Sequence, residues 1–223
     1  MDLIGNYEHT IDSHGRLLTP KRSGDSLFDL LYTHAFRQAV EPIFKLTSGA
    51  MSRYYIDCKQ VSLDAEGAFL IGEEIFERIK LLDVQGVGGM TLGADPIATA
   101  VSLVSFVRGK PVPAFIVRKE PKAHGTKNQI EGRIPNCAKL VVVEDVVTTG
   151  GSTLRTINTL QVAGYTVLKV IALVDRLEGG GEKIAAEGFP FEPLYTLNDF
   201  ISFSAKRLSV LPRPTEAVTR YPA

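Results

Sequence analysis

Two adjacent carboxylates, Glu144 and Asp145, stand between an apolar run and a loop rich in hydroxyl groups and glycine. The apolar run, residues 140–143, is typical of a strand buried on both faces of a parallel sheet. The loop, residues 146–153, is followed by a helical apolar pattern that Gly164 closes. The order strand, loop and helix brings backbone N–H groups and the positive end of a helix dipole to one point. A phosphate group can bind there, so residues 146–153 are called the phosphate loop.

The phosphate loop restricts the kind of ligand. It lacks the lysine of a Walker loop and the GxGxxG spacing of a dinucleotide site. Two acids beside a phosphate repel it, unless they face hydroxyl groups of the same ligand or a divalent cation that the ligand carries. A ribose 5-phosphate meets both demands, because the acids can accept from its 2- and 3-hydroxyls. The alternative is an ordinary capped turn with a few polar side chains.

The acids and the following V-V-T-T-G-G-S-T together resemble the signature of the phosphoribosyltransferases. These enzymes bind phosphoribosyl pyrophosphate (PRPP). The signature alone does not identify the base that accepts the phosphoribosyl group.

A basic segment, residues 118–133, is the second stretch whose residue types could take part in chemistry. It carries six basic side chains, with His124 included, and has no apolar period, so we expect a long mobile loop. One interpretation is a solvated surface excursion. Its position favours another: it leaves the same sheet edge as the phosphate loop, where the departing pyrophosphate of PRPP needs Lys, Arg and Mg2+.

Two further motifs sharpen the resemblance to one family, the orotate phosphoribosyltransferases. R-K-E-x-K-x-H-G in the basic segment is similar to their mobile catalytic loop, and F-x-L-x-S-G-x-x-S-x-Y-Y-x-D, residues 44–57, to their orotate-side hairpin. The resemblance implies transfer of the phosphoribosyl group of PRPP to N1 of orotate, giving orotidine 5-monophosphate in de novo pyrimidine biosynthesis. It also implies Mg2+ carried by PRPP, with no direct protein ligand, and a homodimer whose active site is shared between subunits.

The same resemblance implies the site residues. Those expected at PRPP are Arg118, Lys119, Lys122, His124, Glu144, Asp145, Val146, Val147, Thr148, Thr149, Gly150, Gly151 and Ser152. Lys119, Lys122, His124 and Asp145 are expected to be catalytic, with Lys119 reaching across the dimer interface. Thr148 and Arg176 are expected at orotate, since a guanidinium at a strand end can pair with a carboxylate in two-pronged fashion. The alternative for Arg176 is a surface pair with Asp175.

The chain departs from the family pattern at three places. Many members carry lysine where this chain has Thr47, and Lys45 lies two residues away. Some carry an aromatic-lysine pair where this chain has Leu92-Gly93, which removes a possible pyrophosphate ligand. Glu144 replaces an aspartate, which keeps the charge and lengthens the reach.

The elements that must position these residues alternate between strand and helix. This order predicts an α/β fold of the PRPP-binding phosphoribosyltransferase type, with a central parallel sheet, helices on both faces and a small N-terminal hairpin hood. We expect an irregular extension, a hood of helix and hairpin, an α/β core and an irregular tail, at residues 1–25, 26–62, 63–205 and 206–223.

Local patterns within these segments suggest particular roles. Helical spacing predicts a helix from Ser26 through Val40, and Asp95 is expected to cap another helix. Tyr54 and Tyr55 favour simple packing in the hairpin, although they could instead line a pocket for a flat heterocycle. Glycines in residues 84–93 could let a ligand approach the backbone.

Composition limits the class of protein. The chain has 223 residues with 25 Lys and Arg against 25 Asp and Glu, which argues against a nucleic-acid surface. No apolar stretch is long enough to span a membrane, and Cys58 and Cys137 favour buried free thiols in a reducing, cytoplasmic protein. Two alternatives stay open: a transferase for another base, and a non-catalytic PRPP sensor. The sensor needs a basic DNA-binding segment, which the neutral N-terminal extension does not supply.

Overall fold

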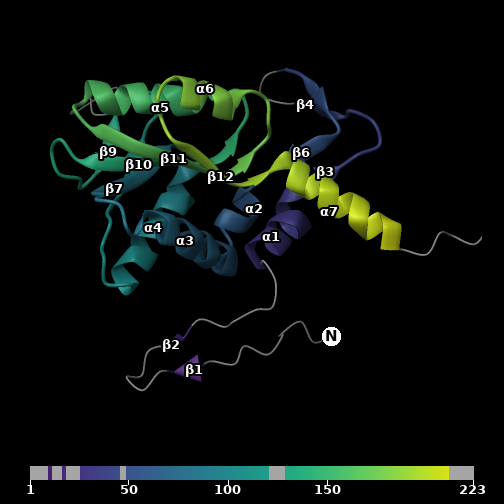
Figure 1. Cartoon of the computed structure of the whole chain (residues 1–223), viewed down its shortest axis with the longest axis horizontal. Helices are drawn as coiled ribbons and strands as arrows, with labels where there is room; N and C mark the ends of the chain where they lie inside the picture. The colour runs from purple at the N-terminus through teal and green to yellow at the C-terminus, as the bar shows by residue number, and fades with distance from the viewer. Residues whose placement is uncertain (1–9, 12–16, 19–25, 46–48, 121–128, 211–223) are drawn as a thin grey trace, which may run out of the picture.

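A six-stranded sheet forms the centre of the computed structural model, which describes residues 10–11, 17–18, 26–45, 49–120 and 129–210. The strand order is β12-β11-β10-β7-β8-β9 (Figure 1), and every neighbouring pair is parallel except β8 and β9. The strands are β7 (Gly86–Met90), β8 (Ala114–Val117), β9 (Ile130–Gly132), β10 (Lys139–Val147), β11 (Thr166–Asp175) and β12 (Phe191–Thr196). The predicted α/β fold with a central parallel sheet is confirmed.

Helices cover both faces of this sheet (Figure 1). They are α1 (Ser26–Leu30), the π-helix η1 (Leu31–Ala35), α2 (Lys59–Ser62), α3 (Ala65–Ile79), α4 (Ala94–Val107), α5 (Gly151–Val162), α6 (Gly180–Ala186) and α7 (Leu197–Val210). Helices α5 and α6 lie on one face, and α3 and α4 lie on the other. Over the described residues, none of the helices has the length and apolar character needed to cross a membrane.

The unbroken apolar run of β10 is explained by these two layers. Val141 and Val143 belong to the core beneath α3 and α4, whereas Leu140 and Val142 belong to the core beneath α5. Successive side chains of a strand point to opposite faces, so a strand covered on both sides needs an apolar residue at every position. The two acids that follow interrupt this apolar run, and Val147 beyond them is again buried in the core beneath α5.

The hood consists of two short antiparallel ribbons. Strand β3 (Phe36–Gln38) pairs with β6 (Tyr54–Ile56), and β4 (Phe44–Lys45) pairs with β5 (Met51–Ser52). The predicted hairpin is present only in part: the strand at Phe44 pairs with Met51–Ser52, whereas the expected partner strand, Tyr54–Ile56, pairs with β3. The predicted helix through Val40 is wrong beyond Ala35. Phe36 is extended, at φ −86° and ψ 137°, and its ring stacks on Tyr54 with centroids 6.1 Å apart. Pairing with a distant strand overrides the helical spacing at this point.

The two ends of the chain differ in part from the expectation. In the first 25 residues the structure describes the two-residue strands β1 (Thr10–Ile11) and β2 (Leu17–Leu18), which pair with each other. At the other end, the prediction of an irregular tail from residue 206 is wrong as far as Val210, because α7 continues to that residue. Phe200 anchors α7: it is fully buried and stacks on Phe28 with ring centroids 4.9 Å apart.

The basic segment also contains regular structure. Residues 130–132 form β9, antiparallel to β8, where the sequence predicted a continuous loop. The backbone N–H of Arg118 donates to the carbonyl of Gln129 at 2.8 Å, which begins this pairing. The expected mobility of the segment concerns mainly residues 121–128, which lie outside the described residues.

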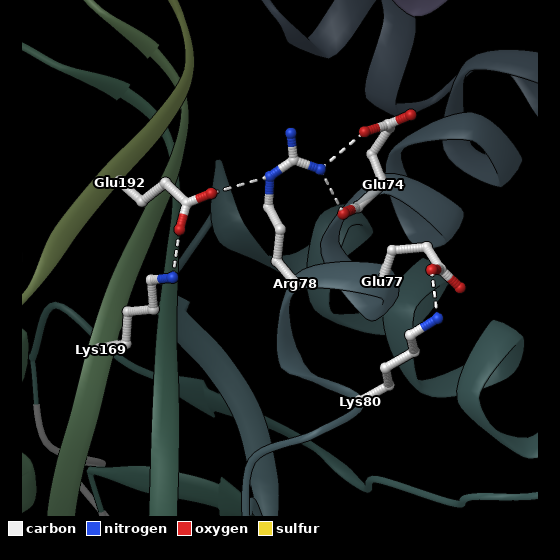
Figure 2. Close-up of polar contacts among 6 residues, drawn as sticks. All are labelled: Glu74, Glu77, Arg78, Lys80, Lys169 and Glu192. Atoms are coloured by element: carbon white, nitrogen blue, oxygen red, sulfur yellow. Dashed lines mark hydrogen bonds and ion pairs between the residues drawn. The ribbon is translucent and has the colours of Figure 1, made fainter.

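Polar contacts between α3 and the sheet edge are shown in Figure 2. Glu192 on β12 accepts from Arg78 on α3 at 3.0 Å and also from Lys169 on β11. On α3 itself Lys80 pairs with Glu77. These side chains are partly exposed, so each pair contributes at most about 1 kcal/mol to stability.

The two cysteines are free, as predicted, but only one of them is buried. Cys58 is fully buried in the core, whereas Cys137 is exposed. Cys137 has a φ of 56° just before β10 begins, so it belongs to a surface turn. The expectation of two buried thiols is therefore wrong for Cys137.

Candidate active site

A cavity of about 500 Å3 opens at the carboxyl ends of β7, β8, β10 and β11, beneath the hood. In parallel sheets this is the edge where ligands bind. The cavity is lined by Lys45, Tyr55, Ile56, Lys59, Met90, Thr91, Leu92, Gly93, Lys119, Glu144, Asp145, Val146, Thr148, Ser152 and Arg176. Residues predicted from three separate motifs thus come together in one place.

The two acids of the signature occupy different environments. Glu144 is only 7% exposed and accepts hydrogen bonds from Ser152 Oγ and Thr153 Oγ1, both at 3.3 Å. Burial and the neighbouring charge of Asp145 raise the pKa of Glu144 to about 8. Asp145 accepts from the backbone N–H of Val146 at 2.9 Å and lies beside Lys59. Glu144 therefore holds a proton to a higher pH than an ordinary glutamate.

The phosphate loop is shorter than the sequence suggested. Strand β10 continues through Val147 and α5 already begins at Gly151, so only residues 148–150 are irregular. Gly150 caps the helix with a φ of 75°, in the left-handed region that favours glycine. The first N–H groups of α5 have no partner within the helix, and they point toward the turn. This geometry suits a phosphate.

Helix α6 supports the phosphate loop from behind. A Cβ atom on Gly180 would lie 2.4 Å from the carbonyl oxygen of Thr148 and 2.8 Å from the backbone nitrogen of Gly150. Of the predicted loop residues, Val146, Thr148 and Ser152 line the cavity. Val147 is buried, Thr149 and Gly150 complete the turn, and Gly151 is the first residue of α5.

Arg176 follows β11 and faces the hood. Its side chain is buried, and Nε donates to Glu178 Oε1 at 2.7 Å. Nη1 donates to the carbonyl of Tyr54 and Nη2 to Ser52 Oγ, both at 3.3 Å. The alternative surface pair with Asp175 is not what the structure shows. Asp175 instead accepts from the backbone N–H of Leu177.

The adjacent tyrosines of the hood serve both roles that the sequence allowed. Tyr54 packs, since its ring stacks on Phe36 inside the hood. Tyr55 lines the cavity, is 41% exposed, and stacks on Phe44 with ring centroids 5.6 Å apart. Lys45 lines the same wall, whereas Thr47, one of the departures from the family pattern, lies outside the described residues.

The glycines at the end of β7 make room for protein atoms. A Cβ atom on Gly88 would lie 2.0 Å from the Phe115 carbonyl oxygen, and one on Gly93 would lie 2.4 Å from Asp145 Oδ1. A side chain at Gly88 would clash with backbone, whereas one at Gly93 would require the Asp145 carboxylate to move. The predicted cap is wrong, because α4 begins at Ala94 and Asp95 accepts from Thr91 Oγ1 instead.

The basic segment contributes to two neighbouring hollows. Lys119 lines the cavity of its own chain together with both acids. Lys119 also borders an adjoining hollow of about 550 Å3, which Arg118 lines without reaching the cavity, and Arg118 Nη1 lies 3.8 Å from Glu131 Oε1. Lys122 and His124, predicted to act at the pyrophosphate, lie outside the described residues.

Lys59 is a cavity residue that the sequence analysis missed. It opens α2 directly after the hood strand β6. A lysine two positions after the Y-Y-x-D motif was a signal, but nothing in the sequence links it to Asp145. Over the described residues, no three His, Cys, Asp or Glu side chains gather in a way that could hold a metal ion.

Comparisons with known proteins agree with this geometry. No protein-family model matches the chain. A curated orotate phosphoribosyltransferase of Aquifex aeolicus is 45% identical over 177 residues, which cover 79% of this chain and 97% of that protein. A solved orotate phosphoribosyltransferase of Mycobacterium tuberculosis superposes with a TM-score of 0.68 at 37% identity, covering 78% and 96% of the two chains. Another structure of that enzyme, in complex with PRPP, has a TM-score of 0.63 at 33% identity, covering 78% of this chain and 89% of that one.

Proposed function

The chain belongs to the orotate phosphoribosyltransferase family, and we propose that it transfers the phosphoribosyl group of PRPP to N1 of orotate. The products are orotidine 5-monophosphate and pyrophosphate, as in the synthesis of UMP. One observation carries the proposal: the acids, the phosphate loop and Arg176 line a single cavity. We place this reaction in the cytoplasm.

The donor half of the cavity is suited to PRPP. The N-terminus of α5 binds the 5-phosphate, and Asp145 and Glu144 accept from the ribose hydroxyls. Lys119 neutralises the pyrophosphate as it departs. Mg2+ enters as part of the substrate, held by the oxygen atoms of PRPP that such a hard cation prefers.

The acceptor half is suited to an anionic base. The guanidinium of Arg176 pairs with the orotate carboxylate, Thr148 contacts the ring, and Tyr55 forms one wall of the pocket. The bond between ribose C1 and pyrophosphate breaks, the bond from C1 to N1 forms, and the N1 proton leaves. Positive charge grows on the ribose during this exchange, so the contribution of the protein is positioning and charge stabilisation.

An absorbance assay tests the proposed reaction directly. Orotate consumption is followed with PRPP and Mg2+, and adenine, hypoxanthine and uracil serve as competing acceptors. We expect turnover with orotate alone, because the other bases have no carboxylate for Arg176. Turnover of uracil or a purine in preference to orotate would overturn the assignment of the acceptor.

We also propose a homodimer, which the outer face of α4 supports. Leu103, Phe106 and Val107 are 65%, 70% and 73% exposed. They form an apolar surface of a kind that is unusual for a monomeric protein. Helix α4 begins at Ala94, beside the cavity residue Gly93, and this apolar surface lies at the opposite end of the helix, so a second copy can bind here without covering the cavity.

The dimer includes active sites shared between subunits, with one change from the expectation. Lys119 was expected in the partner's site, but it lines the cavity of its own chain, and we therefore assign it to its own site. Arg118 does not line that cavity. We assign Arg118 as the residue offered to the partner.

A further inference from the structure

Lys59 connects the hood to the acids of the core. Its Nζ atom lies 2.8 Å from Asp57 Oδ1 and 3.6 Å from Asp145 Oδ2. Asp57 belongs to the end of the hairpin motif, and Asp145 belongs to β10. One ammonium group therefore bridges the hood and β10 at the cavity.

The carboxylate of Asp145 is confined on three sides. The backbone N–H of Val146 donates to Oδ1 at 2.9 Å, and Lys59 approaches Oδ2. On the third side lies the backbone of Gly93, where a Cβ atom would lie 2.4 Å from Oδ1. Two of these constraints come from the backbone, so the contact with Lys59 is the one that a side-chain substitution can remove.

Lys59 stays charged in this position. Burial works against its charged form, but the carboxylates of Asp57 and Asp145 raise the pKa of Lys59 above its ordinary value. Its side chain is 38% exposed, so the pair with Asp145 adds little to the stability of the fold. Because Lys59 lies in the cavity wall, its role is in ligand binding rather than in stability.

We propose that Lys59 is a positioning residue for the transfer reaction: it holds Asp145 in the orientation that meets the ribose hydroxyls of PRPP, and Asp57 holds Lys59. This inference rests on the proposed function, because it assumes that Asp145 binds the ribose. It assigns to the hood a role in donor binding, in addition to its role in covering the acceptor.

A double-mutant cycle tests whether Lys59 acts through Asp145. The affinity of Mg2+-PRPP is measured by calorimetry for the wild type, Lys59→Met, Asp145→Asn and the double variant. We expect Lys59→Met to weaken binding roughly fivefold in the wild-type background, the upper range for such an ion pair. In the Asp145→Asn background the same substitution should change affinity less than about twofold, because its target is gone.

Two conservative variants sharpen the test. Lys59→Arg keeps the charge and should retain most of the affinity. Asp57→Asn should reproduce part of the Lys59→Met loss, although Asp57 does not line the cavity. An equal loss on Lys59→Met in both backgrounds would overturn the proposal, because it would show that Lys59 contacts PRPP directly.

The matched control is Lys80→Met at the C-cap of α3. Lys80 also forms an ion pair with a carboxylate, that of Glu77 (Figure 2), but it lies outside the cavity lining. It should leave PRPP affinity unchanged. If the wild type itself neither binds PRPP nor consumes orotate, the proposed function fails. A wild type that does both, with additive losses in the cycle, contradicts only the role of Lys59.

Discussion

Replacing Arg176 with alanine should weaken the binding of orotate far more than the binding of PRPP. A guanidinium that pairs with a carboxylate forms two charge-assisted hydrogen bonds, together worth about 2 to 4 kcal/mol. In the structure Nη1 and Nη2 already donate to the hood at 3.3 Å, and orotate must displace these long bonds. The net loss therefore falls at the lower end, about 2 to 3 kcal/mol, or roughly a 30- to 150-fold higher KM for orotate.

The assay follows orotate absorbance while each substrate is varied in turn, and calorimetry measures PRPP binding without orotate. Ser52→Ala is the matched control, since it removes the hood partner of Nη2 and leaves the guanidinium in place. Its KM for orotate should change less than about threefold. The assignment is refuted by equal losses for both substrates in Arg176→Ala, or by a Ser52→Ala variant that behaves like it.

Three further predictions follow from the charges and surfaces of the molecule. The pKa of Glu144 is raised from 4.5 to about 8, so its contribution to stability is fully present below pH 4.5 and is lost as the pH rises to 8. Thermal unfolding should show wild-type stability falling over this window, with a smaller fall in Glu144→Gln; identical slopes would contradict the buried proton. In mixed dimers, Arg118→Ala with Asp145→Asn should recover about a quarter of wild-type activity, whereas Lys119→Ala with Asp145→Asn should stay inactive. The reverse outcome would return Lys119 to the partner's site. Phe106→Glu should convert the dimer to a monomer in sedimentation experiments, and an unchanged dimer would place the interface elsewhere.

The donor half of the site was predictable because its signals are local. The apolar run of β10, the two acids and the glycine after α5 lie within one stretch, residues 140–164, and Gly164 indeed has a φ of 85°. Each of these features depends on backbone conformation and on one buried strand. These features can therefore be predicted from the sequence without knowledge of the tertiary contacts.

The features that the sequence did not reveal depend on contacts between distant segments. Phe36 leaves its helix because Ile56 pairs with it, and β9 forms because β8 offers an open edge. Lys59 enters the site only because the hood folds over β10. None of these contacts produces a hydrophobic period or a residue spacing that can be recognised in the sequence.

One hydrogen bond of the sheet joins the two halves of the active site. The backbone N–H of Arg176 donates to the carbonyl of Val147 at 2.9 Å, so the strand end that carries the proposed orotate arginine is tied to the one that carries the phosphate loop. Neighbouring strands keep a spacing of about 4.8 Å. Under the proposed function, donor and acceptor recognition therefore lie on separate strands at a constant separation. A substitution at position 176 or in the hood can then alter the choice of base without displacing the phosphate loop.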